Sequence, residues 1–411
     1  MLRPNDLDAL VNRAAALIEL LRPQEALVSS DLALRVDPRS AIAHVNRGLA
    51  LSELGRYENA LEAFARALEL DPDCGRAYHN RAGALMQMQS FEAALTSCDR
   101  AIELLPGNPD PILGKALCLL SLGRLAQGWP HYEARLNGTL CPMRPLNAPL
   151  PRWRGECLQG KTLFVRWEQI TRMGARVVLE VQPALGRLLA RLRGELRVVT
   201  DTAETGAADF FCPLLSLPGA LETRPESIPA HVPYLTAEPE RIERWRRRIG
   251  DEGYRIGVCW QGLPQPNVDR GRSFPLRLLL QHLADVPGVR LISLQKYDGL
   301  EQLKDLPAGS VLETLGEDFD SGPDAFLDSA AVLMQLDLLV TSDTAIAHLA
   351  GALGREAWVA LRQVPDWRWM LGREDSPWYP THRLFRQSAQ GDWHGVFARM
   401  RAALSLGGAG R

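Results

Sequence analysis

Small and apolar residues in the first third of the chain recur at helical spacing and again with a period of 34 residues. Residues 41–72, AIAHVNRGLALSELGRYENALEAFARALELDP, read as a pair of helices. Gly48 and Ala60 allow these helices to approach closely, and Phe64 fills the space beside them. Pro72 ends the second helix because it cannot continue the hydrogen-bond ladder. Shifts of 34 residues bring similar residues into register at Ala26, Ala33, Pro38, Ala82, Phe91, Ala94, Ala101 and Pro106.

This period, with small residues at fixed places, resembles that of tetratricopeptide repeats. Three clear repeats are expected at residues 7–40, 41–74 and 75–108, with a degenerate fourth at 109–142 that suggests a cap. A single helix pair leaves one face unburied, so the repeats must stack. The resemblance predicts that a protein or peptide binds on the concave face of the array. The alternative is a rigid spacer or a dimerisation element.

A proline-rich stretch separates the repeats from a region of a different kind. Residues 138–154 hold four prolines, and from residue 155 onward short strand-like runs alternate with helical runs. The order of these runs predicts a parallel sheet of Rossmann type. Strands are expected at 255–260, 290–295, 336–341, 358–361 and 382–386, and helices at 276–284, 324–335, 344–353 and 393–404.

Two further strand-like runs follow one another too closely for this pattern. Thr162–Trp167 and Ala175–Glu180 both read as buried strands, yet only seven residues separate them. A parallel return usually takes a dozen or more residues, including a helix. We therefore expect these strands to pair as an antiparallel hairpin, or one of them to leave the sheet. The region before residue 250 is then a thin, incomplete lobe.

Composition and charge exclude several classes of partner. The chain has 411 residues, 46% of them hydrophobic, and a net charge of −2, which gives no electrostatic basis for binding nucleic acid or an anionic membrane. No apolar run approaches the roughly 18–20 residues of a spanning helix. The first residues lack an apolar signal region, so cytoplasm is the expected location. The seven cysteines form no C-x-x-C pair, which argues against a zinc or redox motif.

The strongest local signal for chemistry is TSDTAIAHLAGALG, residues 341–354. A strand ends at Thr341 and a helix of small residues follows it. Free N–H groups and the helix dipole at this N-terminus suit a phosphate, and the carboxyl end of a parallel strand is where such folds bind ligands. His348, one turn into the helix, is expected near the same place. The alternative is an ordinary strand–turn–helix with a capping Asp343 and a packed histidine.

This stretch resembles the nucleotide-diphosphate motif of bacterial glycosyltransferases related to the lipopolysaccharide heptosyltransferases. Five other segments resemble a bacterial group in which tetratricopeptide repeats precede such a transferase. They are PRWRGECLQGKTLFVRWEQ (151–169), CPLLSLPGAL (212–221), GVCWQG (257–262), RGRSFPL (270–276) and VPDWRWMLGREDSPWYPTHRLFRQSAQGDW (364–393). The resemblance implies the GT-B fold, two Rossmann-like lobes after the repeats. The domains are then 1–142 (repeats), 143–250 (acceptor-side lobe, incomplete) and 251–411 (nucleotide-sugar-binding lobe).

The resemblance also assigns roles to residues. It implies a nucleotide sugar as substrate, with no cofactor and no metal for the diphosphate. The residues implied at the donor nucleotide and phosphates are Asp343, Thr344, Ala345, His348, Gln295, Lys296, Trp260, Gln261 and Gly262. Arg270, Arg272 and Ser273 are implied to contact phosphate or acceptor, although the arginines and Lys296 also fit a solvated surface. For Trp367, Arg368 and Trp369 we favour packing over a sugar platform.

The chain departs from this family after its first strand. Related transferases carry a glycine-rich turn and a helix there, including the aspartate expected to act as general base. In this chain Glu168-Gln169 is followed almost directly by Gly174, and Glu168 is the one nearby carboxylate and a weak catalytic candidate. Three interpretations remain: a non-catalytic protein with a retained nucleotide pocket, an enzyme using another carboxylate, or a sequence with an excised segment. The functional expectation is sugar transfer to a protein or glycan, with a non-catalytic repeat scaffold as the alternative.

Overall fold

The helices of the first part of the chain follow the predicted repeat boundaries. The computed structural model describes residues 6–137, 150–166, 176–192, 196–204, 206–265, 269–306 and 309–407. Contacts divide the chain into two units, residues 1–144 and 145–411. The helices of the first unit are α1 (Leu7–Glu19), α2 (Pro23–Val36), α3 (Ala41–Glu53), α4 (Tyr57–Leu70), α5 (Gly75–Gln87), α6 (Phe91–Leu104), α7 (Pro109–Ser121) and α8 (Leu125–Tyr132).

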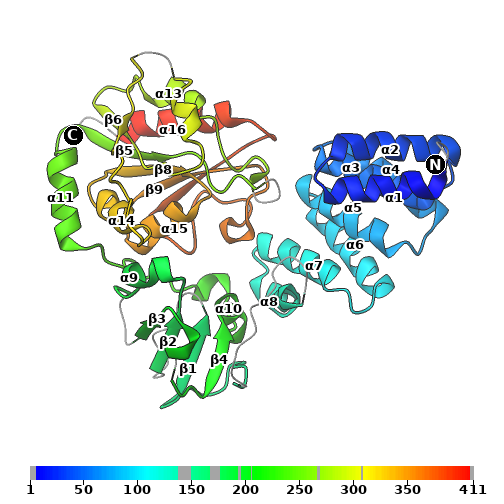
Figure 1. Ribbon diagram of the computed structural model, residues 1–411, viewed down its shortest axis with the longest axis horizontal. Coiled ribbons are helices and arrows are strands. Elements are labelled where there is room, and N and C mark those ends of the chain that lie inside the picture. Colours follow the sequence, from blue (N-terminus) through cyan, green and yellow to red (C-terminus); the bar gives the residue numbers. More distant parts are fainter. Residues whose placement is uncertain are drawn as a thin grey trace. The chain divides into compact units, whose positions relative to one another are not determined.

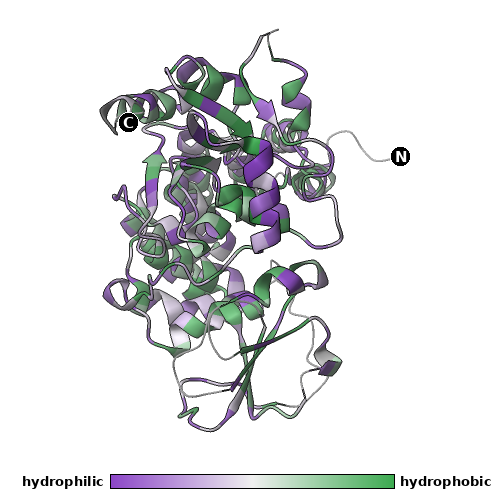
Figure 2. Cartoon of the chain, turned by 90° about the vertical axis from the view of Figure 1, so that its left-hand side faces the viewer, coloured by the Kyte–Doolittle hydropathy of each residue, from purple (hydrophilic) through white to green (hydrophobic). Residues whose placement is uncertain are grey.

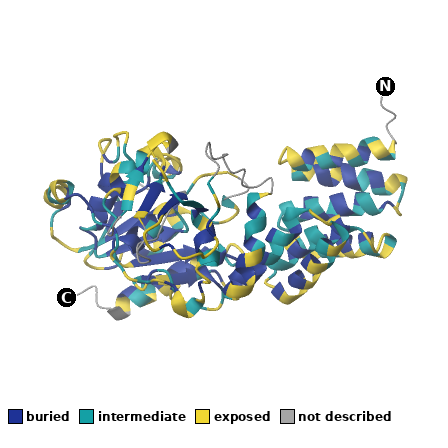
Figure 3. Ribbon diagram, turned by 90° about the horizontal axis from the view of Figure 1, so that it is seen from below, coloured by how far each residue is buried: buried dark blue, intermediate teal, exposed yellow. Residues whose placement is uncertain are grey.

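Small residues set the distance between paired helices in this unit. A Cβ atom added to Gly48 of α3 would lie 2.5 Å from the Phe64 ring of α4. In the fourth pair, a Cβ on Gly128 of α8 would lie 2.6 Å from Leu120 of α7. These two helices therefore also approach closely, although the repeat pattern is degenerate there. Figure 3 shows the buried residues on the facing sides of these helices. Fully buried alanines recur at the period of 34 residues, at Ala26, Ala33, Ala60, Ala67, Ala94 and Ala101.

The second unit holds two sheets, the larger of which is parallel and six-stranded (Figure 1). Its strands are β5 (Tyr254–Cys259), β6 (Val289–Ser293), β7 (Glu313–Thr314), β8 (Leu338–Ser342), β9 (Ala357–Leu361) and β10 (His382–Arg386). Their spatial order is β10-β9-β8-β5-β6-β7, and each neighbouring pair is parallel. The chain builds outward from β5 to one side and then returns to the other side with β8. This is the order of a doubly wound Rossmann sheet, and its switch point lies between β5 and β8.

Helices cover both faces of this sheet and produce two cores. Alternating strand residues point to opposite faces. Leu338 and Val340 pack with α13 (Leu276–Leu283) and α16 (Trp393–Gly407), whereas Leu339 packs with α14 (Leu327–Leu333) and α15 (Ala345–Ala352). Figure 1 shows the two helix pairs on the two sides.

The smaller sheet corrects one expectation. It contains β1 (Thr162–Arg166), β2 (Arg176–Glu180), β3 (Leu196–Val199) and β4 (Phe210–Pro213), in the order β3-β2-β1-β4. β1 and β2 are adjacent and parallel, with Thr162 opposite Arg176, so the predicted hairpin or displaced strand is wrong. The physical reason is reach. Nine residues can span about 30 Å, whereas a return along a five-residue strand needs only about 15 Å.

Other sequence expectations differ from the structure in detail. The helix expected at 324–335 begins at Leu327, because Phe326 before it has a positive φ of 63°. Helix α11 (Pro239–Ile249) and the short strand β7 were not expected. α11 is basic and largely hydrophilic, and it faces the viewer in Figure 2. Among the described residues, none of the helices combines the length and apolar character needed to span a membrane.

Candidate functional site

The loops that leave β5 and β8 meet at the switch point of the six-stranded sheet. A Cβ added to Gly262, after β5, would lie 3.1 Å from Thr344 Cγ2, after β8, and 2.6 Å from Arg272 Nη2. Glycine therefore permits the close approach of these three residues. In sheets of this order, ligands bind outside the carboxyl ends of the strands at such a point.

The first turn of helix α15 has no side-chain cap. Thr344 occupies the N-cap position, but its side chain makes no capping hydrogen bond. Its hydroxyl instead lies 3.1 Å from the Thr341 hydroxyl and 3.4 Å from the Ser342 carbonyl oxygen, to which it donates. Ala345, the first helical residue, is exposed. The Ala347 N–H donates to the Thr344 carbonyl oxygen at 3.1 Å, and the positive end of the helix dipole at this turn suits an anion.

Charged groups of both signs surround this turn. Burial is the main cause that raises the pKa of Asp343, and the neighbouring Asp366 carboxylate raises it further. The Trp369 indole, Arg272 and Arg368 act in the opposite direction without cancelling the effect. The site therefore combines two arginine charges with a carboxylate that is held in a poorly solvated place.

Several polar atoms here are buried without a hydrogen-bond partner among the described residues. They are Ser342 Oγ, Arg272 Nε and Trp369 Nε1. The Trp369 indole is close enough to Asp343 to lower the pKa of that carboxyl, yet the pair does not meet hydrogen-bond geometry. Ser342 ends β8, Arg272 precedes α13 and Trp369 lies in a 3-10 turn. Buried polar groups are usually paired, so these three unpaired donors favour a ligand at this place.

His348 is a packed, neutral histidine. Its Nδ1 lies 3.1 Å from the Tyr379 hydroxyl, and its ring stacks on the Trp369 indole. Burial lowers the pKa of His348 to about 4, and the Arg368 charge acts in the same direction. His348 therefore supports the helix and the Trp369 segment; it does not bring a positive charge to a phosphate.

Tyr379 approaches helix α15 closely because of one glycine. A Cβ on Gly351 would overlap the Tyr379 ring. On the other side of Tyr379, His382 lies with its Nε2 2.9 Å from the Ala347 carbonyl oxygen, and burial lowers its pKa to about 4. The small residues of the helix thus make room for the aromatic residues of the closing segment.

The segment around Trp369 is held in a defined shape. Asp366 accepts hydrogen bonds from the backbone N–H and the guanidinium of Arg368. Met370 adopts a positive φ of 47°, an uncommon conformation for a residue with a side chain. Trp367 and Trp369 are both buried, as expected for packing residues. Trp369, however, also stacks on His348 of α15 and lies near Asp343, so its packing helps to shape the candidate site.

Gln295 joins the ends of β5 and β6 through its side-chain amide. Its Oε1 accepts from the backbone N–H groups of Trp260 and Gln261 at 2.9 and 3.0 Å. Its Nε2 donates to the carbonyl oxygens of Gln261 and Asp298 at 2.8 and 2.7 Å. The Trp260 side chain is fully buried and donates to the Gly299 carbonyl oxygen. Gln295 and Trp260 thus hold the loops that carry Gly262.

The remaining predicted residues lie in different settings. Lys296 Nζ donates to the Phe319 carbonyl oxygen. Ser273 donates through its N–H and hydroxyl to Asp269, and the Arg270 carbonyl oxygen accepts from Arg362. Glu168 lies outside the described residues. In the part of the chain that is described, no group of three or more His, Cys, Asp or Glu side chains is placed to hold a metal ion.

The structure thus brings together Gly262, Arg272, Asp343, Thr344, Ala345 and His348. Sequence reasoning missed Tyr379, His382 and Asp366 as parts of this region, and for Arg368 and Trp369 it favoured packing over a sugar platform. The aromatic-rich segment after residue 364 was visible in the sequence. No spacing rule places such a loop against a helix, so only the fold shows the contact.

Comparison with known proteins identifies the first unit. The tetratricopeptide repeat family matches residues 11–72 and 45–109. Residues 11–109 are tetratricopeptide repeats. They match solved repeat proteins such as YrrB, described as a tetratricopeptide repeat protein with an unusual peptide-binding site (23% identity, TM-score 0.29), and MamA (20% identity, TM-score 0.30). These alignments cover 33% of this chain, with 70% of YrrB and 78% of MamA.

One curated relative extends beyond the repeats. Protein FlbA of Caulobacter vibrioides is 29% identical over an alignment 340 residues long, which covers 73% of this chain and 56% of the relative. The chain therefore spans about half the length of the curated relative that it matches. An alignment of this length reaches from the repeats into the α/β unit.

Proposed function

We propose that the chain is a glycosyltransferase-like protein of GT-B type that binds a nucleotide sugar at the N-terminus of α15. The observation that carries the proposal is the meeting of Gly262, Arg272 and Thr344 at the switch point of the parallel sheet, beside an uncapped helix. A diphosphate fits this place because it can accept from several N–H groups at once. The sugar then goes to a protein or glycan acceptor.

The charged residues fit the departure of a nucleoside diphosphate. When the bond to the sugar breaks, negative charge develops on the leaving phosphate. The α15 dipole and the guanidiniums of Arg272 and Arg368 stabilise that charge. Asp343, whose pKa is raised mainly by burial, holds its proton more readily than an exposed aspartate and so repels the phosphates less.

The acceptor side is proposed to lie at the corresponding place in the smaller sheet. Its order, β3-β2-β1-β4, also puts a switch point beside β1, the strand that ends at Arg166. The related transferases carry their catalytic aspartate on the turn after this strand. Here nine residues connect Arg166 to Arg176, and Glu168 is the carboxylate among them. The competing proposal is a non-catalytic protein that keeps the nucleotide site and serves as a scaffold.

The repeats are proposed to recruit the acceptor or another protein partner. Stacked helix pairs form an extended concave surface, which such arrays use to bind peptide segments. Linking this surface to a transfer site raises the effective concentration of a bound acceptor near the donor.

Nucleotide release separates the two proposals. The assay measures free UDP, GDP or ADP after incubation with the matching nucleotide sugars and candidate protein or glycan acceptors. It compares this chain with one in which a glycine-rich turn and helix are restored between Gln169 and Gly174. Release by the natural chain supports sugar transfer, and release by the restored chain alone supports the non-catalytic alternative. If both chains bind a nucleotide but neither produces free nucleotide from a nucleotide sugar with any acceptor, the result contradicts sugar transfer. The proposed nucleotide-binding site is then still supported.

A further inference from the structure

A cavity lies along β10, an edge strand of the six-stranded sheet that is two strands beyond β8. Its volume is about 780 Å³, and its walls come from β10, from residues 372–374 and from helix α16. Sites for small molecules typically have roughly 300–1,000 Å³. The cavity is thus large enough for a small organic ligand.

Positive charge predominates in this cavity. Its lining includes four arginines, Arg373, Arg383, Arg386 and Arg399, and one acidic residue, Glu374, which gives a formal charge of +3. Two further carboxylates lie beside it: Asp375 pairs with Arg373, and Asp392 accepts from the lining residue Ser388. Four arginines against three carboxylates still leave an excess of one positive charge.

Arg386 carries a largely buried charge without an acidic partner among the described residues. Its guanidinium donates to the carbonyl oxygens of Arg373, Trp369 and Met370, at 3.1, 3.3 and 2.6 Å. Its Nε is buried and has no hydrogen-bond partner in the same part of the chain. Burial of an unpaired charge is costly, so a bound anion would stabilise this wall.

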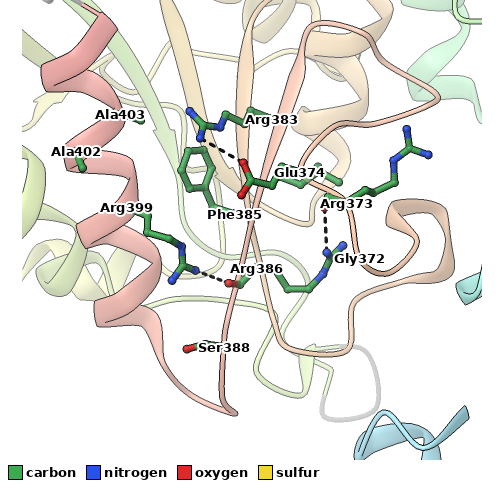
Figure 4. Close-up of a pocket in the computed structure, with 11 residues that line it drawn as sticks. Gly372, Arg373, Glu374, Arg383, Phe385, Arg386, Ser388, Arg399, Ala402 and Ala403 are labelled. Atoms are coloured by element: carbon green, nitrogen blue, oxygen red, sulfur yellow. Dashed lines mark hydrogen bonds and ion pairs between the residues drawn. The ribbon is translucent and has the colours of Figure 1, made fainter.

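The other wall presents donors that remain accessible. Arg399 of α16 is exposed and donates to the Arg386 carbonyl oxygen, and Arg383 lies 3.3 Å from Glu374. A guanidinium has five N–H donors, so each of these contacts leaves several of them available. Figure 4 shows the Phe385 ring between Arg383 and Arg399. The Arg383 guanidinium lies over this ring, 4.8 Å from its centroid.

We propose that this cavity binds a small soluble molecule that carries a phosphate or diphosphate group. The planar, five-donor guanidinium matches phosphate oxygens in pairs, which favours phosphate over a single carboxylate. Phe385, Ala402 and Ala403 provide an apolar side for the organic part of the ligand. The proposal does not depend on sugar transfer, because none of the lining residues belongs to the α15 site.

Calorimetric titration with inorganic pyrophosphate tests this site in the full chain. All proteins carry Arg272→Gln, which is expected to weaken the proposed nucleotide site by about 10-fold or more, so that this site contributes little heat and contributes equally in every protein compared. The test variant adds Arg383→Gln and Arg399→Gln. The matched control adds Arg401→Gln, which removes an arginine from the same helix outside the cavity, where it pairs with Asp285. We expect the double substitution to weaken binding by at least about 10-fold and the control to leave it within about 2-fold.

Three results would overturn the proposal: no heat of binding at millimolar pyrophosphate, equal affinity in the test variant and the control, or binding only to phosphatidic acid vesicles. The last result would point to a lipid surface in place of a soluble ligand. Arg399→Gln alone, at an exposed position, decides the question if the double variant unfolds at a lower temperature than the control.

Discussion

The Trp369 indole stacks on the His348 imidazole, with ring centroids 5.3 Å apart and ring planes inclined by 16°. This contact joins the closing segment of the chain to the helix that follows β8. Tyr379 and His382 extend the same cluster on the other side of Trp369. The shape of the candidate site therefore depends on aromatic packing that begins one turn into α15.

Two neutral histidines in this cluster predict a dependence of stability on pH. Burial lowers the pKa values of His348 and His382 to about 4 in the folded chain, whereas an unfolded histidine titrates near 6.5. Between these values the unfolded state binds more protons, so the free energy of unfolding falls as the pH decreases. The expected loss is on the order of a few kcal/mol from pH 6.5 to 4.

Urea unfolding followed by tryptophan fluorescence at a series of pH values measures this effect. In His382→Asn, which removes one of the two groups, the free energy of unfolding should depend less steeply on pH in this window. Parallel curves for the parent and the variant would contradict the assignment of His382 as a buried, neutral group.

Two glycines of the repeat unit are expected to respond in opposite ways to alanine. Gly48→Ala places a Cβ 2.5 Å from the Phe64 ring and should destabilise the chain by about 1–3 kcal/mol. Gly83 lies in the next helix pair, on α5, and a Cβ there meets no atom within 4 Å. Gly83→Ala should therefore stabilise by about 0.5–1 kcal/mol, because alanine favours the helix.

Thermal and denaturant unfolding of both variants provides the comparison, with each variant serving as the other's control. A loss of stability in both would mean that α5 is packed more tightly than the structure shows. A gain in both would contradict the contact between Gly48 and Phe64.

Gln295→Leu should destabilise the fold in addition to any effect on binding. The leucine has a similar size but cannot accept from the Trp260 and Gln261 N–H groups or donate to the Gln261 and Asp298 carbonyl oxygens. Each buried group left without a partner costs about 1–3 kcal/mol, so the loss of four partners predicts a total loss of at least about 4 kcal/mol. Measured unfolding free energies check this, with the exposed substitution Tyr297→Leu as control. Unchanged stability in Gln295→Leu would show that the amide serves a ligand and not the scaffold.

Local patterns in the sequence predict the repeats and the large sheet well. The period of 34 residues arises because each helix pair needs small residues at fixed positions for its two helices to pack closely. In the structure these residues lie at the contacts between paired helices. The strand–helix alternation after residue 250 likewise gives β5, β6, β8, β9 and β10 in order. Both signals are local, so one chain suffices to read them.

Long-range relations are harder to predict. The parallel pairing of β1 and β2 depends on how far nine residues can reach, and a rule based on helical crossovers fails there. The contact between Trp369 and His348 joins residues whose spacing carries no period. The arginine cavity is lined by residues of β10 and α16, which are separate in the sequence. The sequence of either element alone does not predict a binding site.

The central claim is that the turn after β8 binds a nucleoside diphosphate, and the dissociation constant of the Arg272→Gln variant tests it most directly. Calorimetric titrations with UDP, GDP and ADP use the parent chain, Arg272→Gln and the control Arg277→Gln, an exposed arginine on α13. We predict that at least one nucleotide binds the parent below about 1 mM, that Arg272→Gln weakens it by about 10-fold or more, and that Arg277→Gln does not. Absence of binding by all three nucleotides at millimolar concentration, or equal affinity in both variants, would contradict the claim.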